Sequence, residues 1–341
     1  MPRNPLTLAQ TTTTVLLSVT FFMAGCTSFS QLTQIPPEGQ GGPQASQCGA
    51  CHVEQYQEWQ GTAHAKAFTS QSFQEAIGSP EDDGCLGCHT PLGIREGQTE
   101  ARSFHREEGV TCVSCHLSQG KMHGPHTTSA LFTPHSVQVE DPFYLTPALC
   151  ATCHDETYAQ WQKIEAGQKI RSCQGCHQAE VQRNATEGTN VFSNILVSFE
   201  EKIPTRSHEI SLEKMANFPD GVTLTALALN QGGDTPALKI AIRNKLPHDL
   251  PTGTFGKKEI QLSLIFLKDG VQVAEMRVVV SDGKKGLAAG ETKSFILPLS
   301  LKATLADTLR LNLERHSESH AGRPPIILAS KIINSISKAF H

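Results

Sequence analysis

The chain has 341 residues, which suggests two domains, and a formal net charge of −4. Its charged residues form no basic stripe of the kind that binding to a phosphate backbone requires, so we expect no nucleic-acid partner. Eleven Cys and fifteen His are both high counts for this length. Ten of the eleven Cys fall in pairs spaced two apart, and each pair is followed at once by His.

The first 25 residues have the features of a signal peptide. Their apolar stretch, residues 15–23, is about half as long as a membrane-spanning helix, which favours a signal peptide over a transmembrane anchor. Ala24 and Gly25 precede Cys26, and a Cys in that position resembles the lipidated residue of a bacterial lipoprotein. We predict a signal peptide over residues 1–25 and lipid on Cys26; plain secretion with Cys26 discarded is the alternative.

Residues 26–47 form the predicted connection between this anchor and the first domain. They are rich in Gln, Ser, Pro and Gly, which is typical of a flexible tether. Thr27 follows Cys26, where Asp would signal retention in the inner membrane. We therefore expect an exported lipoprotein of the cell envelope, at the outer membrane or facing the periplasm, with exposure at the cell surface left open.

Five Cys-x-x-Cys-His motifs lie in residues 48–208. Two thiols at this spacing reach two vinyl groups on one edge of a porphyrin and form thioethers, and the adjoining imidazole binds the iron from the proximal side. Composition alone would produce on the order of 0.02 such motifs, so we predict five covalently bound haem c groups. The residues are Cys48, Cys51 and His52; Cys85, Cys88 and His89; Cys112, Cys115 and His116; Cys150, Cys153 and His154; and Cys173, Cys176 and His177.

Other uses of paired cysteines fit this pattern less well. Zinc sites take ligands from paired CxxC units but give no reason for a His after every second Cys. Thioredoxin-like redox motifs occur singly on a βαβ pattern, which is absent here. Disulfides within CxxC pairs would close very small loops and stabilise little.

An internal repeat surrounds the first and fourth motifs. The pattern Cys-His-x-Glu-x-Tyr-x-x-Trp-Gln begins at Cys51 and recurs 102 residues later at Cys153. The Tyr and Trp are three residues apart, so they share one face of a helix that begins at the proximal His. We expect these aromatic side chains to pack against a porphyrin.

The second axial ligand of each iron must come from outside the motifs. Met122 and Met215 are possible ligands, but the supply favours His. Five irons need at most five of the ten His concerned, and we expect the three nearest the C-terminus to be ordinary surface residues. The ten are His64, His105, His123, His126, His135, His208, His248, His316, His320 and His341.

The stretch CGACHVEQYQEWQGTAHAKAF resembles the first-haem segment of the multihaem cytochromes typified by the tetrahaem electron acceptor of hydroxylamine oxidoreductase. The similarity extends over most of residues 48–180. It implies that His64 ligates the haem of the third motif and that His123 or His126 ligates the first. It also implies that His135 serves a later haem.

The resemblance also bears on the second and fifth motifs and on the C-terminal region. The second motif, at His89, corresponds to a five-coordinate haem of the family. The fifth motif and the added C-terminal region are departures from it. Larger relatives have a His just before a β-domain, which suggests His208 as the partner of the fifth haem. The segment around His248 resembles a part of those β-domains where a His lies near a haem; a loop role for His248 is equally open.

Residues 209–341 contain no Cys and differ in pattern from the motif region. Their apolar residues alternate with polar ones, which predicts about seven short strands, and Asp269-Gly270 and Asp282-Gly283 mark turns between them. We therefore expect an α+β chain: a haem-packed, mainly helical or irregular domain over 48–208, then an antiparallel immunoglobulin-like β-sandwich. The alternating runs are 238–242, 260–266, 271–273, 276–280, 295–299 and 309–313.

The last residues, 323–341, have apolar side chains at Leu328, Ile332, Ile336 and Phe340. This spacing predicts a helical tail that packs on the sandwich; a helix that docks on a membrane or a partner is the alternative.

The combined prediction is a pentahaem c-type cytochrome lipoprotein that carries electrons between redox protein partners in the bacterial cell envelope. An iron held by two imidazoles has no open site and can only exchange electrons. The alternative is a reductase or oxidase of a small nitrogen or sulfur compound, with an open iron at the second motif. A further possibility is that the β-domain recognises the redox partner.

Overall fold

The protein is described from a computed structural model of the whole chain. The described residues are 42–78, 83–95, 100–126, 135, 137–138, 142–188, 194–195, 197–198, 200–210, 221–229, 236–253, 256–317 and 322–336. The predicted signal peptide, lipidated Cys26, residues 26–41 of the tether, Met215, His320 and His341 lie outside this set. No helix in the described part of the chain is long and apolar enough to cross a membrane.

The chain forms two compact units. The first consists of Met1–Thr69, Ile77–Leu149 and Gln178–Ile210, and the second of Ser70–Ala76, Cys150–His177 and Ser211–His341. The first three motifs therefore lie in the first unit, and the fourth and fifth lie with the strands of the second. This division differs from the predicted boundary at residue 208.

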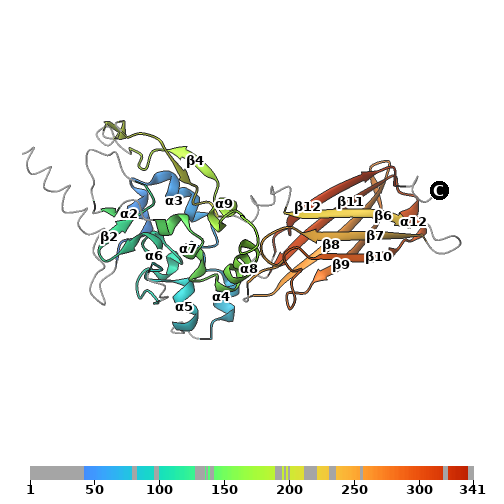
Figure 1. Cartoon of the computed structure of the whole chain (residues 1–341), viewed down its shortest axis with the longest axis horizontal. Helices are drawn as coiled ribbons and strands as arrows, with labels where there is room; N and C mark the ends of the chain where they lie inside the picture. The colour runs from blue at the N-terminus through green and yellow to red at the C-terminus, as the bar shows by residue number, and fades with distance from the viewer. Residues whose placement is uncertain are drawn as a thin grey trace, which may run out of the picture. The chain divides into compact units, whose positions relative to one another are not determined.

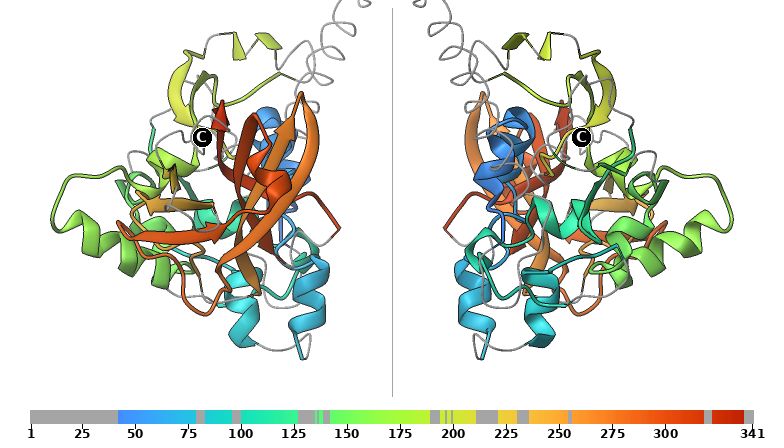
Figure 2. Two further views of the ribbon diagram at one scale, coloured as in Figure 1. Left: turned by 90° about the vertical axis from the view of Figure 1, so that its right-hand side faces the viewer. Right: turned by 90° about the vertical axis from the view of Figure 1, so that its left-hand side faces the viewer.

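The first unit consists of short helices joined by irregular segments and small strand pairs (Figure 2). Strands β1–β3 form one small sheet, and β4 pairs with β5 in an antiparallel ribbon. The elements are α2 (Ala45–Gly49), α3 (Val53–Gln60), α5 (Asp83–His89), η2 (Arg106–Glu108), α6 (Cys112–His116), β1 (Leu117–Ser118), β2 (Lys121–His123), β3 (Val137–Gln138), η3 (Pro142–Leu145), α7 (Ala148–Ala151, which ends in the second unit), β4 (Glu180–Arg183) and β5 (Ile203–Arg206).

The predicted tether is folded at its C-terminal end. Pro43 and Ala45 are buried, and α2 starts at Ala45, so the ordered unit begins before residue 48. The Ala45 N–H donates to both carboxylate oxygens of Glu108, at 2.9 and 3.1 Å. A polar, glycine-rich composition does not reveal that a distant side chain will accept from this backbone.

The second unit contains the two helices that follow the fourth motif and seven strands. Helix α8 (Asp155–Glu165) begins directly after His154, as α3 does after His52, which confirms the helix predicted from the internal repeat. The remaining elements are α4 (Gln71–Ala76), α9 (Cys173–His177), β6 (Val222–Leu229), β7 (Ala237–Asn244), β8 (Lys258–Lys268), β9 (Val271–Ser281), β10 (Thr292–Pro298), α12 (Leu301–Thr304), β11 (Thr308–Ser317) and β12 (Ile326–Asn334).

The seven strands form two antiparallel sheets, in the orders β10-β7-β6 and β12-β11-β8-β9 (Figure 1). Their inward side chains build one apolar core, because alternate residues of a strand face the same side. In β8, Ile260, Leu262, Leu264 and Phe266 are at most 1% exposed. The predicted alternation and the Asp269-Gly270 turn are confirmed, and both turn residues have positive φ, as a tight hairpin turn requires.

The predicted C-terminal helix is wrong over its central part. Ile326–Asn334 form β12, which pairs antiparallel with β11. The spacing of Leu328, Ile332 and Ile336 fits a helix, but the segment is rich in β-branched Ile, which favours a strand where a sheet edge is available. Residues 337–341 lie outside the described set.

Candidate haem-binding site

The ten motif cysteines are well suited to covalent attachment. None of them forms a disulfide, and all are partly exposed. Each motif starts in a short helix, which brings the two thiols of a CxxC pair to one side. Burial raises the pKa of Cys115 to about 11, whereas a neighbouring motif thiol lowers the pKa of Cys173 to about 7.

Three of the five proximal histidines face a second histidine from outside the motifs. The ring centres of His52 and His135 are 6.3 Å apart, with 37° between the ring planes. Those of His116 and His208 are 6.1 Å apart, at 34°. In the second unit, His177 and His248 are 6.4 Å apart, at 36°.

These spacings fit an iron between the two rings. An imidazole nitrogen binds a first-row metal at about 2 Å and lies roughly 1.1 Å from its ring centre, so one metal between two such nitrogens separates the centres by about 6.2 Å. Each of the three pairs could therefore hold one iron between its two imidazoles.

Backbone carbonyls orient the proximal rings. The Nδ1 atom of His52 donates a hydrogen bond to the carbonyl oxygen of Ala185 at 2.7 Å. In the same way, His89 Nδ1 donates to the carbonyl of Ala67 at 2.6 Å, and His116 Nδ1 donates to the carbonyl of His123 at 2.8 Å. A carbonyl only accepts, so each Nδ1 carries the proton and Nε2 is left with the lone pair that a metal binds.

His248 lies in the loop after β7, and several hydrogen bonds hold this loop. Its own Nδ1 bonds the Asp249 carbonyl at 3.0 Å. The buried side chain of Asn244 donates to the carbonyls of His248 and Leu287, at 2.9 and 3.0 Å, and accepts from the Leu246 N–H at 2.9 Å. Sequence reasoning missed Asn244, although its place before a Pro-His-x-x-Pro loop marks it as a candidate loop anchor.

Burial keeps these imidazoles neutral, as metal binding requires. It lowers the pKa of His208 to about 3 and that of His177 to about 4, with neighbouring cations and histidines adding to the effect. Burial also lowers the pKa of His116, His154 and His248.

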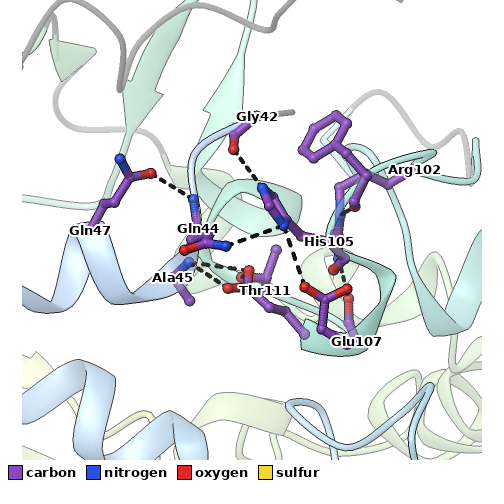
Figure 3. A network of polar contacts seen from close by, with 11 residues as sticks. Gly42, Gln44, Ala45, Gln47, Arg102, His105, Glu107 and Thr111 are labelled. Carbon is purple, nitrogen blue, oxygen red and sulfur yellow. Dashed lines mark hydrogen bonds and ion pairs between the residues drawn. The ribbon is translucent and has the colours of Figure 1, made fainter. Parts of the chain in front are cut away.

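His105 has a structural role instead of the ligand role that its position between motifs allowed. Its Nε2 bonds the Gly42 carbonyl at 2.9 Å, and its Nδ1 lies 3.4 Å from a carboxylate oxygen of Glu107 and 3.5 Å from the Gln44 amide (Figure 3). These contacts hold Gly42 and Gln44 against the loop before the third motif.

Arg102 anchors the same loop from inside. Its side chain is fully buried and makes five hydrogen bonds. Burial lowers the pKa of Arg102 to about 10, so the guanidinium stays charged at neutral pH. The acceptors are the carbonyls of Pro91, Phe104, His105 and Gly109 and the Ser114 hydroxyl, at 2.8–3.0 Å.

The remaining candidates occupy different positions. The His64 carbonyl accepts from the Val110 N–H at 2.9 Å, which places the His64 backbone beside the third motif. His123 Nε2 bonds the Ser118 carbonyl at 3.2 Å, and burial lowers the pKa of His123. His316 Nε2 lies 3.3 Å from Glu314 on the sandwich, as expected of an ordinary surface His. His126 ends a described stretch, and Met122 lies in β2.

The ring pairs differ from those that the family resemblance implied. The His135 ring lies nearest His52 of the first motif, where the resemblance implied a later haem, and the His208 ring lies nearest His116 of the third motif, where it implied the fifth. His248, which sequence reasoning left open between two roles, faces the fifth. Spacing along the chain does not show which loop lies near which motif, because that depends on how the loops fold back.

Known proteins match parts of this chain. Residues 47–117 match the family described as cytochrome c554 and c-prime. Cytochrome c-554 of Nitrosomonas europaea is 35% identical over 95 residues, which cover 24% of this chain and 40% of the relative. The chain thus matches about two fifths of the length of that curated relative.

A solved structure is similar over most of the chain. The penta-heme cytochrome c552 from Thermochromatium tepidum gives a TM-score of 0.56 at 17% identity, and the match covers 86% of this chain and 98% of that one. At this identity the likeness concerns the fold. Together, the comparisons show that residues 47–117 resemble a cytochrome c family and that most of the chain shares its fold with a penta-heme cytochrome c.

Proposed function

We propose that this chain is a pentahaem electron carrier of the bacterial cell envelope. The observation that carries the proposal is the set of three imidazole pairs whose centres are 6.1–6.4 Å apart, each joining a CxxCH histidine to a histidine from elsewhere in the chain. Five motifs, ten thiols without disulfides and a pentahaem neighbour in fold support the count of five haems.

The residues of the chain suit transfer of electrons rather than binding of a substrate. Haem iron supplies one-electron redox chemistry when it is bound. His135, His208 and His248 would occupy the second coordination site of the irons held by His52, His116 and His177, so a substrate could not bind to those irons. Burial and the backbone bonds to Nδ1 fix the rings, so little rearrangement accompanies a change of charge.

We propose that the distal ligands for His89 and His154 come from among His64, His123 and His126. If no side chain closes the second motif, the iron at His89 is the place for the alternative function, reduction or oxidation of a small nitrogen or sulfur compound. Most of residues 48–180 resemble a family with one five-coordinate haem, and this resemblance supports an open iron at His89.

Partner recognition and anchoring complete the proposal. The strand orders β10-β7-β6 and β12-β11-β8-β9 fit an immunoglobulin-like sandwich, since hairpins within one sheet alternate with connections that cross to the other sheet, after β7, β9 and β10. Such a sandwich offers loops and an outer sheet face to a redox protein partner. The sequence around Cys26 further supports a lipid anchor at the outer membrane or in the periplasm.

Electron paramagnetic resonance of the oxidised protein, combined with a reductive titration, tests this function. We expect low-spin signals of irons with two imidazole ligands and stepwise uptake of about five electrons per chain. A dominant high-spin signal that shifts when nitrite, hydroxylamine or sulfite is added would favour the enzyme instead.

A further inference from the structure

We propose that the chain contains two copies of one two-haem module, and that Glu58 and Gln160 are positioning residues for the distal ligand of the second haem in each copy. This inference rests on the proposed function. The first copy joins the first and third motifs within the first unit, and the second joins the fourth and fifth motifs within the second unit. The internal sequence repeat covers only the beginning of each copy.

A tryptophan makes the same contact in both copies. Trp59 Nε1 donates to the carbonyl of Val110 at 2.8 Å, and Trp161 Nε1 donates to the carbonyl of Arg171 at 2.9 Å. Each of these carbonyls lies two residues before the first Cys of the next motif in its module. The Trp ring also stacks on the Tyr three residues before it, at 5.8 Å in one copy and 6.0 Å in the other.

The thiols repeat the pattern as well. Cys48 hydrogen-bonds to Cys112 in the first copy, and Cys150 hydrogen-bonds to Cys173 in the second. In both copies the contact joins the first Cys of one motif to the first Cys of the other. The edges at which two haems would be attached therefore meet in the same way twice.

The residue six positions after the first proximal His holds the distal ligand of the other haem. Glu58 Oε2 accepts from the backbone N–H of His208 at 2.8 Å, and His208 faces His116. Gln160 Oε1 accepts from the backbone N–H of Asp249 at 2.9 Å, next to His248, which faces His177. A helix that starts at one haem thus fixes the ligand of its neighbour.

The repetition is in the contacts and not only in the sequence. The distal histidines come from unrelated segments, the end of the β4–β5 ribbon in the first copy and the loop after β7 in the second. The residues at the sixth position are also chemically different, a carboxylate and an amide. What they share is a side-chain oxygen that accepts from a backbone N–H, and this is the property that the module needs.

The surroundings of the two acceptors explain why one is charged. Arg183, whose side chain is 7% exposed, donates to Glu58 Oε1 at 2.9 Å and to the Arg206 carbonyl at 3.2 Å. In the second copy the Thr252 hydroxyl donates to Gln160 at 3.0 Å, and no charge is involved. The amide chemistry of the second copy predicts that Glu58→Gln will keep the module intact.

The test is carbon monoxide binding to the reduced full-length protein, with haem content and electron paramagnetic resonance measured on the same samples. Glu58→Ala and Gln160→Ala remove the acceptor and loosen the distal histidine, so each should raise the number of haems that bind carbon monoxide by about one per chain relative to wild type. The double variant should raise it by about two. Glu58→Gln should match wild type.

Matched controls separate ligand positioning from general packing. Glu54 contacts the same Arg183 at 3.4 Å but is 53% exposed and lies one turn earlier, so Glu54→Ala should bind no additional carbon monoxide. In the second copy the matched control is Gln162, an exposed residue two positions after Gln160. Gln162→Ala should likewise bind no additional carbon monoxide.

Two results would overturn the inference while the proposed function stands: alanine variants that bind five haems and no additional carbon monoxide, or a Glu58→Gln variant that behaves like Glu58→Ala. If Glu58→Ala does not mature, Gln160→Ala and Glu58→Gln decide the matter by the same readout. A wild-type protein with fewer than five haems would instead contradict the proposed function.

Discussion

At the scale of single residues, the backbone of Gly109 is the most constrained point beside the third motif. Its φ is +60°. An added Cβ would overlap the backbone nitrogen of Ala67, 2.9 Å away, and would lie still closer to the carbonyl oxygen of His64. We expect Gly109→Ala to destabilise the protein by about 1–3 kcal/mol, measured by thermal unfolding followed by far-UV circular dichroism.

Gly124→Ala is the control for this substitution. Nothing lies within 4 Å of an added Cβ there, and its φ is not positive. It should change the free energy of unfolding by less than roughly 1 kcal/mol. Equal effects of the two substitutions would show that the left-handed backbone at Gly109 is not the cause.

His248 gives the sharpest residue-level test of a distal ligand. His248→Ala removes the ring 6.4 Å from His177, so about one haem per chain should become high-spin and bind carbon monoxide after reduction. His316→Ala, which removes a ring paired with Glu314 on the sandwich, should leave the spectrum unchanged. An unchanged spectrum of His248→Ala would exclude His248 as an axial ligand.

The CxxCH spacing predicts the five proximal histidines from sequence alone, because two thiols and an imidazole must lie at that spacing to hold one haem. The distal residues were only partly predictable. His135 and His208 were candidates, but their partners depend on which loop returns to which motif. His105 has the same local features as a ligand, and only the fold shows its ring bonded to Gly42.

At the scale of elements, strand β8 carries the core of the sandwich. Phe266 is fully buried between β9 and β11, where Ala274 and Leu309 are its cross-strand partners. Phe266→Ala should cost about 3–5 kcal/mol, seen as a lower urea midpoint of the β-sheet signal in circular dichroism. Val271 is 67% exposed, so Val271→Ala should cost less than roughly 0.5 kcal/mol. Similar midpoints for both variants would contradict the assigned core.

Strands with strict alternation and a marked turn were predictable, since both signals are local. The β8–β9 hairpin is an example. The C-terminal segment was not, because an apolar residue at every fourth position fits a helix, while the pairing of β12 with β11 depends on an edge that only the assembled sheet offers.

At the scale of the whole molecule, the sequence indicated a boundary at residue 208 because composition changes there. The compact units instead place residues 150–177 with the strands. Contacts of Gln160 with Asp249 and Thr252 explain this grouping. These contacts join positions about 90 residues apart, and composition does not show which distant residues will meet.

The count of covalent haems on the purified mature protein tests the account most directly. Pyridine haemochrome absorbance and intact mass should both give five haems per chain, and Cys173→Ser combined with Cys176→Ser should give four, since one haem loses both thioether links. A wild-type chain that is colourless, or whose mass equals that of its amino acids and any lipid, would contradict the account.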